Sequence, residues 1–131
     1  MEAAQALADL TEISTQIKAA ALFRADGTVD ASTLADGTRF VEAARALVSA
    51  ADGVRNEPLV QLEAASAEGS VFVVRDGDRV VAAVTGPEPT VGLVFYDLKS
   101  CLRASAEGEE AAKPKRAPKR KAKEEEDGDE A

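Results

Sequence analysis

The chain has 131 residues and a formal net charge of −8, with no His, no Trp and a single Cys. This composition excludes an internal disulfide and leaves zinc-type metal sites and general-base catalysis by His without their usual residues. The excess of acidic residues also disfavours nucleic-acid binding by the folded part, because phosphate contacts need clustered positive charge. No basic leader or apolar stretch of about 20 residues occurs, so we expect a soluble cytoplasmic protein without metal or cofactor.

The first predicted elements are a helix and a β-hairpin. Apolar side chains recur at helical spacing through residues 3–17. Two short strands then flank Asp26-Gly27, a dipeptide typical of hairpin turns because glycine accepts a positive φ. The second strand, residues 28–33, carries polar side chains that suit the edge of a sheet. The helical stripe comprises Ala3, Leu7, Leu10, Ile13 and Ile17.

The middle of the chain predicts a second helix and an alternating strand. Residues 36–51 have the apolar spacing of one helix face, and Gly53 follows as a typical helix end. Residues 58–65 alternate, with Val60, Leu62 and Ala64 on one face, which indicates a strand with one partly exposed face. The apolar side of the helix comprises Phe40, Ala44, Leu47, Val48 and Ala51.

Residues 70–86 contain the clearest hairpin signal. Two apolar runs flank Asp76-Gly77, and in each run both sets of alternating side chains are apolar. A strand that is apolar on both faces lies inside a sheet covered on both sides. The two helices predicted so far do not suffice to cover both faces of the sheet, so the chain needs a third helix.

Residues 91–103 are assigned to that third helix, although Val, Phe and Tyr favour strands. Val91, Phe95, Leu98 and Leu102 recur at steps of four, three and four, which is the spacing of one helix face. Thr90 can cap the helix. The complete order predicts an α+β sandwich built on a five-stranded, mostly antiparallel sheet with helices on both faces.

The composition changes near residue 104. Residues 1–103 hold 9 basic and 15 acidic side chains, whereas residues 104–131 contain no Val, Ile, Leu or aromatic residue. A segment of the second kind cannot bury enough apolar surface to offset its ordering entropy. We therefore predict a folded domain over residues 1–103 and a disordered charged tail over residues 104–131.

The order of elements and the hairpin positions resemble the Roadblock/dynein light chain domain family, including its stand-alone bacterial members. The resemblance implies a profilin-like topology with sheet order 2-1-5-4-3 and with the second helix opposite the other two. It also implies a homodimer in which the third strand and second helix meet their symmetry mates. The segments carrying the likeness are "AAALFRADGTVDAST", "LVQLEAA", "SVFVVRDGDRVVAAVTGPEP" and "TVGLVFYDLKSCLR". The residues then expected at the dimer interface are Leu59, Val60, Leu62, Ala64, Leu47, Val48 and Ala51.

The resemblance further implies a non-catalytic platform that binds a small Ras-like GTPase and regulates or positions it. The partner would contact the exposed side of the second helix. An alternative for the two arginines there is ordinary helix-surface charge, with an ion pair to the intervening glutamate. A different function class is a dimeric scaffold that gathers other proteins without contacting a GTPase. The expected partner-binding residues are Arg39, Glu42, Arg45, Ala46 and Ser49.

The sequence does not indicate an enzyme. Cys101 falls on the apolar side of the last helix, where a small buried hydrophobe explains it better than a nucleophile. Asp76 and Asp78 form a carboxylate pair, but their place at a hairpin tip indicates solvated side chains. The chain has no Gly-rich phosphate loop with a following Lys and Ser or Thr.

The tail contains a basic block, residues 113–123, followed by an acidic run, residues 124–130. The basic block alone is typical of an arm that contacts phosphate, so a nucleic-acid-associated protein is a third function class. The acidic run competes for the same cations and favours a solubilising segment of mixed charge. The residues that would contact a polyanion are Lys113, Lys115, Arg116, Lys119, Arg120, Lys121 and Lys123.

Overall fold

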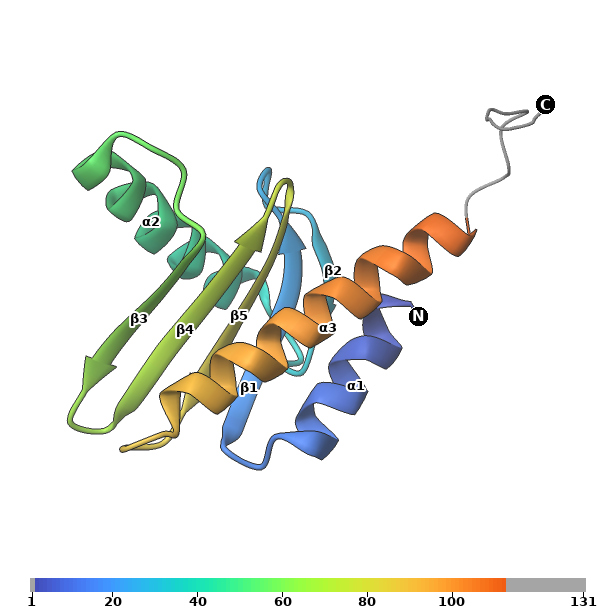
Figure 1. Ribbon diagram of the computed structural model, residues 1–131, viewed down its shortest axis with the longest axis horizontal. Helices are drawn as coiled ribbons and strands as arrows, with labels where there is room; N and C mark the ends of the chain where they lie inside the picture. Colours follow the sequence, from blue (N-terminus) through green and yellow to red (C-terminus); the bar gives the residue numbers. More distant parts are fainter. Residues whose placement is uncertain (1, 113–131) are drawn as a thin grey trace.

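The computed structural model describes residues 2–112, which form three helices and one five-stranded sheet (Figure 1). The strand order is β2-β1-β5-β4-β3, and every neighbouring pair is antiparallel. The predicted α+β fold, element order and sheet order are therefore confirmed. The elements are α1 (Ala3–Ile13), β1 (Ile17–Arg24), β2 (Val29–Ser32), α2 (Thr38–Arg55), β3 (Gln61–Ser66), β4 (Gly69–Asp76), β5 (Arg79–Thr85) and α3 (Val91–Ala112).

The sheet is covered on both faces, with α1 and α3 on one side and α2 on the other (Figure 1). Successive residues of β4 enter different cores: Phe72 packs on the α1 and α3 side, and Val73 packs on the α2 side. Both side chains are fully buried. This alternation explains why the β4–β5 hairpin is apolar at nearly every position.

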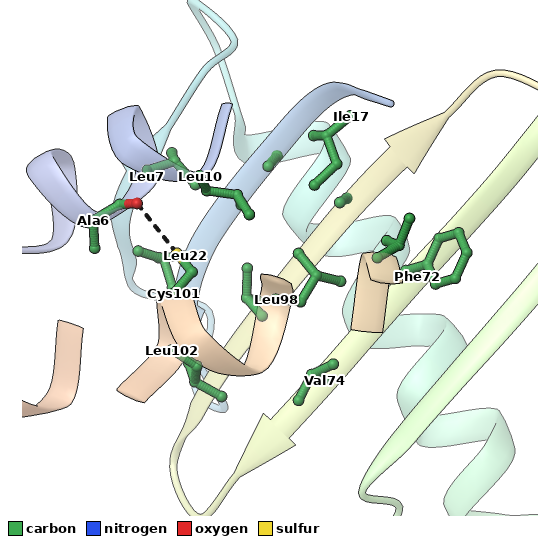
Figure 2. Packing of buried hydrophobic residues seen from close by; sticks show 14 residues of the cluster. Ala6, Leu7, Leu10, Ile17, Leu22, Phe72, Val74, Leu98, Cys101 and Leu102 are labelled. Carbon is green, nitrogen blue, oxygen red and sulfur yellow. Dashed lines mark hydrogen bonds between the residues drawn. The ribbon is translucent and has the colours of Figure 1, made fainter. Parts of the chain in front are cut away.

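The core beneath α1 and α3 is shown in Figure 2. Leu10 from α1 and Leu98 and Leu102 from α3 belong to the same buried cluster above the sheet. The ring of Phe72 contacts that of Phe95 edge-on, with centroids 5.0 Å apart and an interplanar angle of 76°, an arrangement that aromatic pairs prefer. The last segment is a helix that buries Leu98 completely, so the prediction from its periodicity is confirmed over its β-favouring composition.

The structure corrects the end of the first predicted helix. α1 stops at Ile13, whose side chain is 72% exposed, and Ile17 begins β1 as a buried residue. The chain leaves the helix at Ser14, where φ is −102° and ψ is 96°. Helical spacing therefore no longer applies beyond that residue, and the predicted stripe was wrong for its last two members.

The predicted end of the second helix was also wrong. α2 passes through Gly53 and continues to Arg55. The terminating residue is Asn56, which has a left-handed backbone with φ 58° and ψ 34°. Asn tolerates this conformation better than most residues do. The following strand consequently starts at Gln61, later than the alternating pattern indicated.

The third helix is longer than the sequence predicted. α3 continues beyond Arg103 to Ala112. Ser105 and Gly108 are buried there, and both line a cavity together with Ala3 at the start of α1. Small residues in this part of α3 therefore face the start of α1 at close range. Residues 113–131 lie outside the described part of the chain, so the division into a domain and a tail remains a proposal.

The buried aromatic pair yields a stability prediction. Phe72→Ala should lower the free energy of unfolding by about 3–5 kcal/mol, because a large side chain is removed from a core closed on all sides. Tyr96→Ala is the matched control, since Tyr96 on α3 is 68% exposed; it should change stability by no more than about 0.5 kcal/mol. Urea denaturation of both variants measures the difference, and equal effects would contradict the assignment of the core.

Candidate functional site

The outward side of α2 carries most of the residues predicted to bind a partner. Arg39, Glu42, Ala46 and Ser49 are all exposed. They recur at steps of three, four and three, which places them on one face of the helix. Ala43 is exposed as well. The resulting surface is built of one cation, one anion and several small side chains.

Arg45 differs from the other predicted partner-binding residues because its guanidinium is held by contacts within the protein. Its Nε donates to the carbonyl oxygen of Ala25 at 3.1 Å, and its Nη1 lies 3.1 Å from Oε2 of Glu42. The guanidinium lies over the β1–β2 turn, where a Cβ at Gly27 would be only 2.9 Å from Nη1. The ion pair considered as an alternative from the sequence is present. Arg45 therefore holds α2 to this turn.

The residues in and just before β3 that were predicted for a dimer interface differ in exposure. Leu59 and Leu62 are half-buried and pack against the core under α2. Ala64 pairs with Val71 on the same face of the sheet but is exposed. Val60 precedes the strand and is 63% exposed. Within residues 2–112, β4 is the only strand neighbour of β3, so the other edge of β3 is open.

The three α2 residues predicted for the same interface are also placed unequally. Leu47 and Ala51 are half-buried. Val48 is 8% exposed and belongs to the core of its own chain. Leu47 and Ala51 could therefore contact a second copy directly, whereas Val48 would pack α2 against the sheet of its own chain.

An ion pair between α2 and β4 was missed by the sequence analysis. The guanidinium of Arg75 contacts both carboxylate oxygens of Asp52, with Nη2 2.9 Å from Oδ1 and Nη1 3.1 Å from Oδ2. The same Arg75 donates through Nε to the carbonyl oxygen of Leu59 at 2.8 Å, and Leu59 N donates to Asp52 Oδ1 at 2.7 Å. These bonds fix the connection between α2 and β3. No local signal marks the pair, because its members are far apart in the chain.

The Arg75 hydrogen bonds hold the pKa of Asp52 below its ordinary value of 3.8, and the Leu59 N–H acts in the same direction. The carboxylate is therefore ionised at neutral pH and the ion pair is intact. Since Arg75 is the next-to-last residue of β4, the pair positions one end of β3 relative to the β4–β5 turn.

The other chemical candidates have structural explanations. Burial raises the pKa of the Cys101 thiol to about 12, and its Sγ lies 3.5 Å from the carbonyl oxygen of Ala6 (Figure 2). The thiol stays protonated near neutral pH, as befits the predicted buried hydrophobe. Asp76 and Asp78 are exposed at the hairpin tip, where Asp78 lies 3.4 Å from Arg24.

Within residues 2–112, no group of three or more His, Cys, Asp or Glu side chains is placed to hold a metal ion. No helix in this part of the chain is both long enough and apolar enough to cross a membrane. The seven cationic residues predicted to contact a polyanion lie outside the described residues, so that hypothesis has no structural outcome.

Several solved structures share this architecture at low sequence identity. The Roadblock/LC7 domain from Streptomyces avermitilis aligns with a TM-score of 0.73 and 16% identity, over 84% of this chain and 99% of that chain. The gliding protein MglB from Thermus thermophilus aligns with a TM-score of 0.71 and 16% identity, over 84% and 90%. An MglB in a tetrameric arrangement aligns with a TM-score of 0.68 and 17% identity, over 82% and 90%.

These alignments show that the chain has the Roadblock/LC7-type fold. They confirm the resemblance predicted from the sequence at the level of the fold. No protein-family model matches the sequence, and no curated protein matches it significantly. The function must therefore be argued from the surfaces of the molecule.

The Asp52–Arg75 pair predicts a pH-dependent loss of stability. Because the folded-state pKa of Asp52 is depressed, the pair stabilises the fold fully above pH 3.8 and less as the pH falls through the lower folded-state value. Asp52→Asn keeps the shape but removes the charge, so it should destabilise the protein at neutral pH. The difference in the free energy of unfolding between this variant and the wild type should become smaller at acidic pH.

Denaturation between about pH 7 and about pH 2 measures this narrowing. Asp76→Asn is the control, since the side chain of Asp76 is exposed and makes no hydrogen bond or ion pair among residues 2–112. The control should leave stability nearly unchanged at neutral pH. A difference between Asp52→Asn and wild type that stays constant over the whole range would contradict the role assigned to the ion pair.

Proposed function

We propose that this protein is a non-catalytic, homodimeric interaction platform that binds a small Ras-like GTPase and regulates or positions it. The observation that carries the proposal is the combination of an exposed α2 surface with an open β3 edge beside it. The class of partner comes from the family that the sequence resembles. The Roadblock/LC7-type fold, shared with the MglB structures, supports that choice.

The two faces of the sheet are covered unequally, which favours a homodimer. Two helices cover one face, and a single helix covers the other. Leu62 and Val71 on the α2 side are only half-buried in a single chain. A second copy that supplied another α2 would remove these apolar side chains from water, which is favourable in proportion to the area covered.

The edge of β3 offers a way to bring that second copy into place. Its outer backbone N–H and C=O groups have no strand partner within residues 2–112. Glu63 is the only charged residue of the strand, so little protects this edge from pairing. Pairing of β3 with its symmetry mate would extend the sheet about a twofold axis, and each copy would contribute the same surface.

A dimer of this kind would present two α2 helices on one side. The exposed faces around Ala46 would lie together and form a broad surface without bulky side chains at its centre. Such a surface suits a folded partner that approaches closely. Arg39 and Glu42 would supply the charges that orient it, a role in which electrostatic complementarity affects specificity and association rate more than affinity.

The alternative is a structural scaffold that gathers proteins without contacting a GTPase. The tetrameric arrangement of one MglB favours this alternative, since it is an example of the same fold in a higher assembly. A nucleic-acid-associated function would depend on the basic block of residues 113–123 and therefore on a part of the chain outside the structure.

The dimer proposal predicts different effects on the dimer for substitutions at two adjacent residues of β3. Ala64→Arg would place a charge on the α2 face at the seam, where it would lack a partner and lose solvation, so the dimer should weaken. Ala65→Arg is the matched control, because Ala65 pairs with Ser70 on the opposite face and is exposed. Light scattering after gel filtration should give a dimer for the wild type and for the control.

Two results would contradict this arrangement. The first is a monomeric wild type at tens of micromolar, on the order of the concentration at which ordinary dimers form. The second is an equal effect of both substitutions on the oligomeric state. Circular dichroism of each variant would establish that the protein is folded.

The partner proposal predicts that charge reversal on α2 weakens GTPase binding. Arg39→Glu should lower the affinity for a cognate small GTPase about tenfold, equivalent to about 1.4 kcal/mol. Arg103→Glu is the matched control, since Arg103 is an exposed arginine on α3, on the other side of the sheet. Arg45 is unsuitable because it holds the β1–β2 turn.

Calorimetric titration of both variants would measure the affinities, with the GTPase in its GDP-bound and GTP-bound states. Light scattering should give an unchanged dimer in each case. Failure of all small GTPases of the organism to bind the wild type, in both nucleotide states, would leave the scaffold as the better proposal. If Arg39→Glu and Arg103→Glu lowered the affinity for the GTPase equally, the proposal that the partner binds α2 would be contradicted.

A further inference from the structure

A groove runs between α1 and α3 on the face of the sheet opposite to α2. It encloses about 170 Å³. Cys101 of α3 and Ala6 of α1 lie at its floor, joined by the hydrogen bond drawn in Figure 2. Asp9 and Ile13 line it from α1, and Asp97 lines it from α3. It is a shallow cleft with an apolar floor and carboxylates on both walls.

The carboxylates of this groove lack cationic neighbours. Asp97 has no hydrogen-bond or ion-pair partner among residues 2–112, and Asp9 accepts a single hydrogen bond from Gln5 at 2.9 Å. The cations of α3 lie elsewhere: Lys99 and Arg103 line a different cavity, toward β4. No Lys or Arg of the described residues lines the groove.

α1 adds to the excess of negative charge along the groove. It contains Asp9 and Glu12 and no basic residue. Ile13 at its end is 72% exposed, although a large aliphatic side chain is costly to leave in water. Negative charge beside exposed apolar surface is complementary to a cationic segment with aliphatic stems, such as those of Lys and Arg.

The chain carries such a segment close to the groove. α3 ends at Ala112, and residues 113–123 follow directly with seven positive charges and no negative one. Ala104, at the near end of the groove, lies about 12 Å along the helix axis from Ala112, and Asp97 lies about 22 Å from it. Eleven extended residues span about 36 Å. The segment is therefore long enough to return along the groove to Asp97.

We propose that the groove between α1 and α3 is the docking site of the basic block, residues 113–123, of the same chain. The Lys and Arg side chains pair with Asp9 and Asp97, and their aliphatic stems cover Ile13. The contacts are electrostatic and lie at the surface, so docking weakens as salt increases.

Docking at this site affects the availability of the basic block without touching the α2 surface. A docked block cannot contact phosphate or another polyanion until it is displaced. The site pairs an acidic domain with the basic block, for whose cations the acidic run of residues 124–130 also competes. It does not depend on the proposed GTPase partner.

The test uses the full chain, labelled with ¹⁵N, and compares amide spectra at about 20 mM and about 500 mM salt, where the screening length falls from about 20 Å to about 4 Å. In the wild type, the signals of the groove residues and of residues 113–123 should shift together with salt. Asp9→Asn combined with Asp97→Asn should reduce these shifts at least about threefold, because both carboxylates are removed. The dispersion of the amide signals reports directly whether each variant is folded.

A matched control removes two charges away from the groove. Glu68→Gln combined with Asp76→Asn alters exposed carboxylates near the two ends of β4 and should leave the salt-dependent shifts of the groove unchanged. The reciprocal variant, with Lys119, Arg120 and Lys121 all replaced by Gln, should reduce the shifts at Asp9 and Asp97. The two sides of the contact are thereby tested separately.

Three results would overturn the proposal. The first is a wild type without coupled salt-dependent shifts in the groove and the basic block. The second is an equal reduction by the groove variant and its control, which would indicate a diffuse effect of net charge. The third is a loss of the shifts on tenfold dilution, which would assign the contact to separate molecules.

Discussion

The fold depends on one requirement, that the central β4–β5 hairpin be covered on both faces. Phe72 and Val73 are neighbours in the chain, yet each is fully buried in a different core. Removal of one such side chain from water contributes about 1.5–3 kcal/mol, so exposure of either face would be a large loss for a small domain. α3 covers one face of the hairpin and α2 covers the other, while α1 lies beside α3 over β1 and β2.

The cover is complete on one face only, and the proposed function follows from that difference. A helix with its side chains is about 10–12 Å wide, whereas five strands at about 4.8 Å spacing extend over about 19 Å. Two helices can span this width and one cannot. The apolar residues near β3 therefore remain partly open in a single chain, beside a strand edge that has no partner among residues 2–112. The proposed association with a second copy would complete a core that the chain alone leaves partly open.

The sequence predicts the elements well because their signals are local, and it fails where tertiary contacts decide. Gly53 signalled a helix end, but it lies in open space and is tolerated inside α2 at a cost of about 1 kcal/mol. The extension of α3 was missed because its buried positions there are Ser105 and Gly108, which carry no large apolar side chain to mark a helix face. Within the site, exposure along α2 was predictable from spacing. The anchoring of Arg45 was not, because its partner, Ala25, is distant in the chain.

The contacts of α2 separate residues that hold the helix from residues that face outward. Arg45 fastens the helix to the β1–β2 turn, and Asp52 fastens it to β4 and to the start of β3. Arg39 and Ala46 are exposed, and their side chains make no hydrogen bond or ion pair among residues 2–112. Apart from Glu42, which pairs with Arg45, the outward surface is thus positioned rigidly by side chains that do not belong to it. A surface held in this way loses little conformational freedom when a partner binds. Its own residues can also change without loss of the fold, so domains with this architecture can differ in partner while they keep the same sheet and helices.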